Sequence, residues 1–457
     1  MKKITSRTII CFFLSMILVA GTGVFVFRFV TQGGTWAAFT SNRHLYSGKV
    51  LQGGKILDRN GTVLAQFDEG KGTWVYPGNT ALRMAILHSV GDTTGMIGTG
   101  ALTRFADKLS GYNLITGAKP VFSGGRYLYL TLDSATCQAA YTALNGKKGT
   151  VGVYNYKTGE ILCMVSSPTY DPANPPKIQD GDERYDGVYI NRLLSARFIP
   201  GSTFKLITAT AALETISDLE SRTFTCEGKT VVGNQLITCQ SAHGEMSFKD
   251  ALAKSCNCTF GQIASEVGSK TLKKYIEKSG ITGSYSVNGI DTMASTYDLS
   301  SEDAGDLAWA GIGQGKDLVN PCAMMVYCGA IANRGYAAIP QIIEKTAIKQ
   351  NVRTSLYINR HTEDLIEADT AEMLAAYMRN NVEANYGSGN FPGLNICAKS
   401  GTAQTGGDNK ESAWFVGFLQ DDEHPYAFVV LVEEGGSGSK VAGRVANTVL
   451  QTLVRHD

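Results

Sequence analysis

An uncharged apolar run near the N-terminus constrains this chain more than any other feature of the sequence. From Ile9 to Phe27 every residue is apolar or small. A helix rises about 1.5 Å per residue, so roughly nineteen residues span about 28 Å, close to the hydrocarbon thickness of a bilayer. Lys2, Lys3 and Arg7 precede the run, and positively charged flanks tend to stay in the cytoplasm. We therefore expect residues 1–30 to form a cytoplasmic tip and a transmembrane anchor that places the rest of the chain outside the cytoplasm.

A cleaved signal peptide is the alternative, with Val19, Ala20 and Gly21 as its small-residue cleavage region. The apolar run continues past that point to Phe27, which is longer than such a signal usually needs and favours the anchor. No second apolar stretch of comparable length follows. We therefore expect a single-pass protein of the cell membrane with an extracytoplasmic body, which works without ATP.

Composition narrows the class of protein further. The 42 Lys and Arg residues nearly balance the 41 Asp and Glu residues, so no strong net field recruits nucleic acid. The 51 glycines favour a mixed fold with short strands over a long helical bundle. The ten cysteines match no paired C-x-x-C and His spacing, so we expect neither a metal site nor a cofactor. Cys226 and Cys239 flank one short polar segment and could oxidise outside the cytoplasm, and the sequence leaves that disulfide open.

Two further units are expected after the anchor. Residues 31–125 should form a short membrane-proximal, non-catalytic unit with a hairpin, Lys55–Leu57 and Thr62–Gln66, around the Asn-Gly turn at 60–61. In residues 126–457 we expect strands at Tyr127–Leu132, Thr150–Tyr156, Glu160–Ser166, Asn395–Ala398, Trp414–Leu419 and Ala427–Glu433. Helices are expected at Ser134–Leu144, Phe204–Glu214, Phe248–Glu266, Leu318–Ala332 and Val441–Val454. Strands at both ends with helices between them predict an α+β fold, in which helices cover a central antiparallel sheet whose first and last strands meet.

Ser202 and Lys205 form the first pattern that carries chemistry. Residues three apart share a face of a helix, so Lys205 can reach the Ser202 hydroxyl. A serine hydroxyl becomes a good nucleophile only when a base takes its proton, and lysine can serve if burial lowers its pKa from about 10.4. The same spacing occurs at Ser437 and Lys440, and a helix cap explains either pair equally well.

Ser255 and Asn257 form the second pattern, within a predicted helix. A hydroxyl two residues from a carboxamide could relay a proton and hold a substrate amide. Ser286–Asn288 and Ser388–Asn390 fit this pattern too, and the simpler interpretation of each is a turn or a helix end.

The third pattern is Lys399–Thr402 (Lys-Ser-Gly-Thr), directly after the predicted strand Asn395–Ala398. At a sheet edge it would offer a fixed positive charge, close backbone approach at its glycine and a hydroxyl at its threonine. Lys157–Gly159 and Lys278–Gly280 are similar, but their contexts predict a hairpin turn and a helix end. Each pattern alone is common. Their order along the chain is not, and it is the signature of serine acyl transferases that react with penicillin.

Beyond these motifs, the chain closely resembles the penicillin-binding proteins over about 330 residues. The resemblance lies in Tyr129–Ala140 (YLTLDSATCQAA), Thr150–Ser167, Asn191–Lys205 (NRLLSARFIPGSTFK), Gly311–Gly315 (GIGQG) and Gly54–Ala65 (GKILDRNGTVLA). The last of these is similar to the N-terminal strand pair of the monofunctional class B members. The resemblance implies a transpeptidase domain of the serine β-lactamase-like fold over residues 126–457, and peptidoglycan D,D-transpeptidase activity.

The resemblance also implies roles for single residues. Ser202 would be the nucleophile and Lys205 its base. Ser255 would relay a proton to the leaving D-alanine, Asn257 would hold the substrate amide, and Lys399 would support the positive field. The substrate-binding residues would be Ser400, Gly401 and Thr402, which would meet the terminal carboxylate of a D-Ala-D-Ala stem or of a β-lactam. Backbone N–H groups of Ser202 and Thr402 would form the oxyanion hole.

Fewer than about 100 residues separate the anchor from this unit, too few for the glycosyltransferase domain of bifunctional relatives. We therefore expect an enzyme that cross-links glycan but does not polymerise it. The resemblance suggests, as a partner, a membrane glycosyltransferase of the shape, elongation, division and sporulation type. The other expected partners are peptidoglycan stem peptides, β-lactams and the cytoplasmic membrane.

Other functions share part of this pattern. A D,D-carboxypeptidase performs the same first half-reaction, so the motifs leave it open. A serine β-lactamase needs a deacylating residue, and none can be assigned here. Only about eight residues precede the anchor, too few for the effector domain of a β-lactam sensor. A catalytically dispensable scaffold of a cell-wall synthesis complex would tolerate loss of Ser202 or Lys205, yet both are present.

Overall fold

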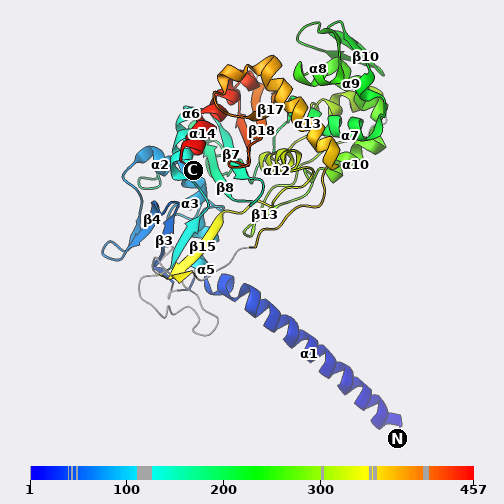
Figure 1. Cartoon of the computed structure of the whole chain (residues 1–457). Helices are drawn as coiled ribbons and strands as arrows, with labels where there is room; N and C mark the ends of the chain where they lie inside the picture. The colour runs from blue at the N-terminus through cyan, green and yellow to red at the C-terminus, as the bar shows by residue number, and fades with distance from the viewer. Residues whose placement is uncertain are drawn as a thin grey trace.

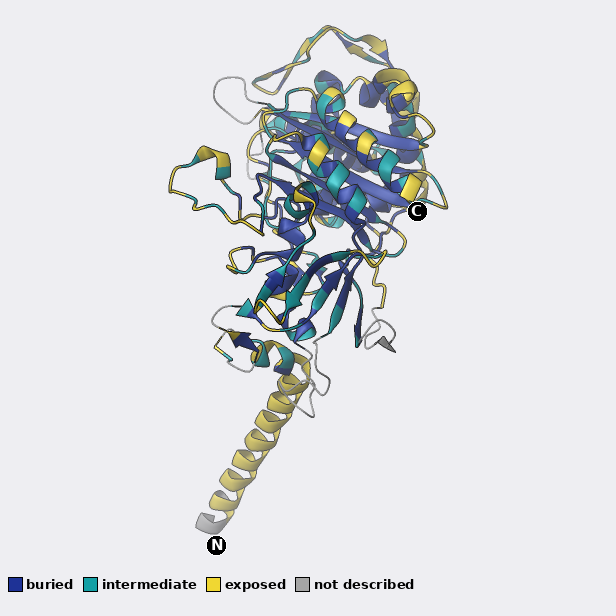
Figure 2. Cartoon of the chain, turned by 90° about the vertical axis from the view of Figure 1, so that its left-hand side faces the viewer, coloured by how far each residue is buried: buried dark blue, intermediate teal, exposed yellow. Residues whose placement is uncertain are grey.

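The computed structural model describes residues 2–39, 41–42, 45–47, 50–110, 126–299, 303–348, 352–353, 358–404 and 411–456. Its first element is the helix α1 (Lys2–Ala37), which projects away from the body in Figure 1 and is exposed along most of its described length in Figure 2. Within Arg7–Ala37 the mean hydropathy reaches 2.6. The predicted apolar N-terminal helix is confirmed, and its length and composition suit a membrane span, although a signal sequence has the same properties.

A small sheet lies between α1 and the main body (Figure 1). Among the described residues its order is β16-β15-β6-β3-β4-β5. These strands are β3 (Lys55–Leu57), β4 (Val63–Asp68), β5 (Thr73–Val75), β6 (Tyr127–Leu130), β15 (Ile343–Ile348) and β16 (Val352–Arg353). The predicted hairpin of β3 and β4 is present, and the Asp58 carboxylate accepts hydrogen bonds from the N–H groups of Asn60 and Thr62 across its turn.

This sheet takes strands from both sides of the expected boundary at residue 125, because β3 pairs in parallel with β6. Residues 111–125 lie outside the described residues, so the division at 125 stays a prediction. The shorter elements before the boundary are β1 (Tyr46–Ser47), β2 (Val50–Leu51), α2 (Thr80–Ala85), α3 (Leu87–Val90), α4 (Ala101–Arg104) and α5 (Ala106–Leu109).

The main sheet runs in the order β17-β18-β19-β7-β8 through the described residues, and every neighbouring pair is antiparallel. Its strands are β7 (Gly149–Asn155), β8 (Ile161–Ser167), β17 (Ile396–Gln404), β18 (Glu411–Leu419) and β19 (Tyr426–Val432). The pairing of β19 with β7 joins the two ends of the unit, as predicted from the sequence. These strands are buried on both faces and consist largely of apolar residues, as expected for a sheet between two helical layers.

Helices cover both faces of the main sheet. Figure 1 shows α6 and α14 on one side and α12 on the other. Their bounds are α6 (Ser134–Leu144), α12 (Pro321–Ala332) and α14 (Gly443–His456). A lobe beyond the sheet contains α7 (Lys205–Thr215), α8 (Phe248–Ala253), α9 (Asn257–Val267), α10 (Ser269–Lys278), α11 (Ala304–Gly311) and α13 (Ala368–Asn381). The same lobe carries the short strands β9 (Phe224–Cys226), β10 (Lys229–Val232), β11 (Gln235–Thr238) and β12 (Gly244–Met246). The fold is the predicted α+β arrangement.

Gly417 is a point of close approach between β17 and β18. It pairs with Ala398, the residue before Lys399. A Cβ at Gly417 would overlap the carbonyl oxygen of Cys397 and lie 2.9 Å from the Cα of Ala398. Both obstacles are backbone atoms, which cannot rotate aside, so only glycine fits at this position.

We expect Gly417→Ala to lower the stability of the full-length protein by about 1–3 kcal/mol, because the added methyl group forces two buried strands apart. Thermal unfolding in detergent measures the loss. Gly78→Ala is the matched control, since a Cβ there meets nothing within 4 Å. Its expected effect is within about 0.5 kcal/mol. Equal unfolding temperatures for the two variants would contradict the packing argument.

Candidate active site

The turn that carries Ser202 is fixed against the edge of the main sheet. Ser202 lies in the 3₁₀ turn Gly201–Thr203, which leads through one residue into α7. Gly201 has φ +53°, and a Cβ there would lie 2.6 Å from the carbonyl oxygen of Thr402 in β17. Glycine accommodates both that backbone angle and that approach. The Ser202 turn and the strand that carries Lys399–Thr402 therefore lie side by side.

The segment before this turn is held by Asn320. Its Nδ2 donates to the carbonyl oxygens of Leu193 at 3.2 Å, Leu194 at 3.1 Å and Ala196 at 2.7 Å. The indole N–H of Trp414, in β18, donates to the carbonyl of Ile199 at 2.9 Å. These side-chain donors satisfy the backbone carbonyls of the irregular segment before Ser202, which lack the regular hydrogen bonds of a helix or strand. The segment is therefore held in one position.

The amine of Lys205 is fully buried and surrounded by oxygen atoms. Its Nζ lies 3.1 Å from Ser202 Oγ, 3.3 Å from Ser255 Oγ and 2.7 Å from the Ser255 carbonyl oxygen. It also lies 2.6 Å from Oδ1 of Asn257. The Nδ2 of Asn257 donates to the carbonyl of Thr238 at 2.8 Å, so its oxygen must face the lysine. The first two sequence patterns thus form one cluster.

A neutral Lys205 amine fits this geometry. Its two N–H groups can donate at the two shortest contacts, to the Ser255 carbonyl and to Asn257, which leaves a lone pair for the Ser202 hydroxyl proton. Burial lowers the pKa of Lys205 from 10.5 to about 8, while the neighbouring thiols act to raise it. A lysine with that pKa is partly neutral near neutral pH, as a general base requires.

The helix predicted over Phe248–Glu266 is wrong, because it breaks at Ser255. Helix α8 ends at Ala253 and α9 begins at Asn257, and Ser255 between them has φ +54°. This left-handed conformation is uncommon for a residue with a Cβ and costs about 1–2 kcal/mol. It brings both the carbonyl and the hydroxyl of Ser255 to Lys205. Contacts with residues distant in sequence outweigh the local preference for a continuous helix.

A second buried amine faces the same hydroxyl. Lys399 is also fully buried, and its Nζ donates to Ser255 Oγ at 3.0 Å and to the carbonyl of Ser400 at 2.8 Å. Burial holds the pKa of Lys399 well below its usual value, and the charge of Lys205 lowers it further. Within the described ranges no carboxylate pairs with either amine. Because two uncompensated cations repel each other in a buried site, the geometry favours one neutral and one charged lysine.

Ser400 lies beside Lys399 but its hydroxyl faces the other side of β17. The hydroxyl and the N–H of Ser400 lie 3.0 Å and 2.9 Å from the phenol oxygen of Tyr386. Tyr386 is buried and packs against Phe415, which is the partner of Ser400 in β18. Side chains alternate along a strand, so this hydroxyl lies away from Ser255. Sequence analysis missed Tyr386, since a single tyrosine outside any motif gives no signal.

Gly401 and Thr402 continue β17 along the Ser202 turn. A Cβ at Gly401 would lie 2.9 Å from the carbonyl oxygen of Pro200. Thr402 is partly exposed, and its carbonyl accepts a hydrogen bond from the side chain of Gln314 at 3.4 Å. This contact brings the glycine-rich segment Gly311–Gly315 to the site. In the described part of the chain β17 ends the strand order, which confirms the predicted sheet edge.

The similar patterns elsewhere in the sequence have structural roles. Asn288 follows β13 (Ser286–Val287), and its side-chain oxygen accepts from the N–H groups of Ile342 and Ile343. Lys157–Gly159 forms the turn between β7 and β8, as predicted. Ser437 precedes the π-helical turn Gly438–Ala442.

A group of thiols next to Asn257 was also missed. The Sγ of Cys239 accepts the backbone N–H of Asn257 at 3.1 Å. Cys226 and Cys256 lie beside it, with sulfur atoms 3.8 Å from that of Cys239. All ten cysteines are free, so the structure contains no disulfide between Cys226 and Cys239.

Comparisons with known proteins give the family. Residues 149–451 match the model of the penicillin-binding protein transpeptidase domain. The chain is 26% identical over 354 residues to peptidoglycan D,D-transpeptidase PbpA of Mycolicibacterium smegmatis, an alignment that covers 71% of this chain and 72% of that protein.

Solved structures agree with this fold. The D,D-transpeptidase domain of a peptidoglycan glycosyltransferase from Eggerthella lenta is 25% identical, with a TM-score of 0.75 over 89% of this chain and 99% of that one. Penicillin-binding protein A from M. tuberculosis, in a ceftriaxone acyl-enzyme complex, is 24% identical, with a TM-score of 0.74 over 88% and 98%. The family model covers well over half of the sequence, from the first strand of the main sheet into α14. This chain therefore belongs to the penicillin-binding protein transpeptidase family, and its relatives are class B penicillin-binding proteins.

Proposed function

We propose that this chain is a peptidoglycan D,D-transpeptidase that forms an acyl-enzyme on Ser202. The observation that carries the proposal is the convergence of Ser202 and Ser255 on the buried amines of Lys205 and Lys399. Acyl transfer through an ester requires a hydroxyl nucleophile, a base with a lowered pKa and a route for the proton to the leaving group. These four side chains supply all three.

In the first half-reaction Ser202 Oγ bonds to the carbonyl carbon of the penultimate D-alanine, and Lys205 takes the hydroxyl proton. The peptide C–N bond then breaks. The proton passes from Lys205 to Ser255, whose hydroxyl lies 3.3 Å away, and on to the nitrogen of the leaving D-alanine. In the second half-reaction an acceptor amine attacks the ester, and its proton returns by the same route to Ser202. A β-lactam would acylate Ser202 in the same way, and the reaction would stop at the acyl-enzyme.

The remaining residues bind and orient the substrate in this proposal. Backbone N–H groups of Ser202 and Thr402 form the oxyanion hole, supported by the contact between the two segments. Thr402 meets the terminal carboxylate, Lys399 supports the positive field of the site from its buried position, and Gly401 admits the substrate backbone. The hydroxyl of Ser400 bonds to Tyr386 on the other side of β17. In this proposal Ser400 therefore helps to position the strand. Asn257 orients Lys205 now, and it can hold a substrate amide once its Nδ2 leaves the carbonyl of Thr238.

We also infer that α1 anchors the chain in the cytoplasmic membrane and leaves the sheet and its site outside the cytoplasm. The support is the exposed apolar length of α1 and the basic residues before it. Stem peptides of peptidoglycan would then be the substrates and β-lactams the inhibitors. Glycan polymerisation would belong to a partner, a membrane glycosyltransferase of the shape, elongation, division and sporulation type.

Covalent labelling tests the nucleophile. Full-length protein in detergent should form a stable adduct with fluorescent penicillin, and mass spectrometry should locate it on Ser202. Ser202→Ala should abolish the adduct, because the one other hydroxyl near the Lys205 amine in the described part of the chain is that of Ser255, at 3.3 Å, which the proposal assigns to proton relay. Ser437→Ala is the matched control, since Ser437 and Lys440 have the same spacing, and it should label like wild type. An adduct that survives Ser202→Ala would overturn the assignment.

The pH dependence of acylation tests the base. Lys205 acts only when neutral, and its pKa is about 8, so the acylation rate should rise with pH and level off above about pH 9. The rise between pH 6 and pH 8 should be about 50-fold for a single group with that pKa. Stopped-flow acylation gives the profile. Lys205→Arg should lose at least about 100-fold in rate, whereas Lys440→Arg should keep the wild-type profile. A flat profile would exclude Lys205 as the titrating base.

Product analysis separates transpeptidase from carboxypeptidase activity. With a pentapeptide stem ending in D-Ala-D-Ala and a D-amino acid acceptor, we expect mainly the exchanged pentapeptide. A tetrapeptide as the only product would mean that water is the acceptor and the chain is a D,D-carboxypeptidase. D-alanine release and chromatography of the peptides distinguish these outcomes. If neither product forms and penicillin does not label Ser202, the chain is a scaffold of a cell-wall synthesis complex.

A further inference from the structure

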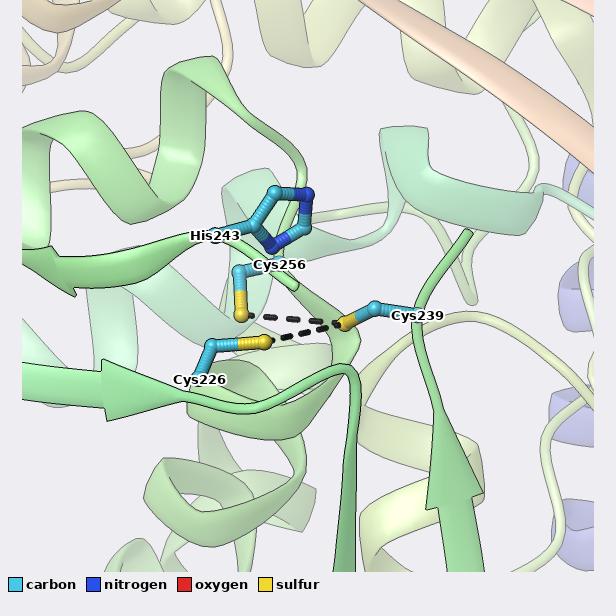
Figure 3. A group of neighbouring side chains, drawn as sticks. All are labelled: Cys226, Cys239, His243 and Cys256. Carbon is cyan, nitrogen blue, oxygen red and sulfur yellow. Dashed lines mark hydrogen bonds between the residues drawn. The ribbon is translucent and has the colours of Figure 1, made fainter. Parts of the chain in front are cut away.

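Four potential metal ligands converge at one point beside the candidate active site (Figure 3). Cys226 ends β9, Cys239 follows β11, His243 precedes β12, and Cys256 precedes α9. Their ligand atoms all lie within 4.8 Å of one another. Because each residue comes from a different turn or strand end, their meeting is a property of the fold and not of a local motif.

The distances between the sulfur atoms suit a tetrahedral metal site. The sulfur of Cys239 lies 3.8 Å from that of Cys226 and 3.8 Å from that of Cys256. Zinc binds thiolate at about 2.3 Å, which gives a tetrahedron with an edge of about 3.8 Å. A disulfide bond needs about 2.05 Å, and one cysteine can pair with only one other. The equal distances from Cys239 to Cys226 and Cys256 match the metal geometry. The thiol of Cys258 also lies 3.5 Å from that of Cys239, but the group with a histidine nitrogen is Cys226, Cys239, His243 and Cys256.

The fourth ligand would be a histidine nitrogen, which lacks a hydrogen-bond partner among the described residues. Nδ1 of His243 is buried, and no described residue provides it with a hydrogen-bond partner. In Figure 3 this side of the ring faces the three sulfur atoms. A buried imidazole nitrogen normally has a hydrogen bond, and leaving one unpaired costs about 1–3 kcal/mol. A metal ion among the sulfurs would satisfy it.

Backbone N–H groups also point at the sulfur atoms, as they do around metal-bound thiolates. Cys239 accepts from the N–H of Asn257 at 3.1 Å and from that of Cys258 at 3.4 Å. Cys226 accepts from Gly228 at 3.4 Å, and Cys256 accepts from Thr259 at 3.4 Å. Several of these donors belong to the first turn of α9, whose positive end favours negative charge. Each of the three sulfurs therefore accepts a hydrogen bond from at least one backbone N–H group.

We propose that Cys226, Cys239, His243 and Cys256 bind one zinc ion. Three thiolates and one imidazole form a soft ligand set, which selects zinc over calcium or magnesium. All four corners of the tetrahedron are occupied by protein, so the site is structural and has no open position for substrate. The bound ion would also keep these thiols from oxidising to a disulfide outside the cytoplasm.

The zinc site would hold the second sequence pattern in place. Cys256 lies between Ser255 and Asn257, so a ligand bond at its sulfur fixes the peptide units that carry both side chains. The surrounding strands β9 to β12 are three or four residues long, and short strands of this kind need a cross-link to be rigid. This positioning role depends on the proposed function, whereas zinc binding itself does not.

Metal analysis of the full-length protein, purified in detergent without chelator, tests the site. Elemental mass spectrometry should find about one zinc ion per chain. Cys226→Ser and His243→Ala should each reduce the content at least about 10-fold. Cys137→Ala is the matched control, since Cys137 is a buried thiol in α6, outside the cluster, and it should keep its zinc. Replacing zinc with Co²⁺ should produce the charge-transfer absorption of cobalt bound to thiolate.

Three results would overturn the proposal. These are wild-type protein without zinc, zinc content unchanged in both cluster variants, and a disulfide among Cys226, Cys239 and Cys256 found by non-reducing peptide mapping. If a cluster variant does not fold, the zinc content and cobalt spectrum of the wild-type protein decide.

The positioning role has its own test. Zinc removal by a chelator should slow penicillin acylation of wild type at least about 10-fold, and added Zn²⁺ should restore it. An unchanged rate after verified zinc loss would refute positioning and leave zinc binding intact. Failure of Ser202 to label at any zinc content would instead count against the proposed function.

Discussion

Two buried amines that have no counter-charge among the described residues are the constraint on which the rest of this structure depends. Lys205 and Lys399 are both fully buried, and both contact the hydroxyl of Ser255. A buried ammonium is stable only when oxygen atoms replace the water it has lost. The fold supplies them as backbone carbonyls and one carboxamide, and the left-handed conformation of Ser255 and the orientation of Asn257 both serve that purpose. The same burial lowers the pKa of Lys205, as the base in the proposed function would require.

Much of the fold follows from local sequence. Apolar runs with turn residues between them predicted the β7–β8 hairpin and the meeting of β7 with β19. Helix α6 has the predicted bounds, since Asp133 caps its start and Asn145 ends it in a left-handed conformation. The residues of the three patterns were also predicted, because their order in the sequence is distinctive. What they do chemically stays a proposal until acylation is measured.

The rest could not be predicted because it depends on contacts between distant residues. The helix breaks at Ser255, where the hydroxyl contacts the amines of Lys205 and Lys399. Lys399 is 144 residues away in the sequence. The direction of the Ser400 hydroxyl depends on Tyr386, which no motif marks. The cysteine and histidine cluster was missed for a similar reason. Its ligands are separated by twelve, three and twelve residues, and only the folding of short strands brings them together.

The position of β17 at the end of the sheet has an evolutionary consequence. Several main-chain groups on its outer side already have side-chain partners, among them the N–H of Ser400 with Tyr386 and the carbonyl of Thr402 with Gln314. A strand-like molecule would be recognised by the main-chain groups that such contacts leave accessible. Point mutations change side chains, and apart from proline they leave those groups in place. The part of a peptide mimic's binding that depends on these main-chain groups would therefore survive single substitutions along this edge. Escape from such a mimic would have to come from residues that tilt or shift the strand, far from the atoms that the mimic touches.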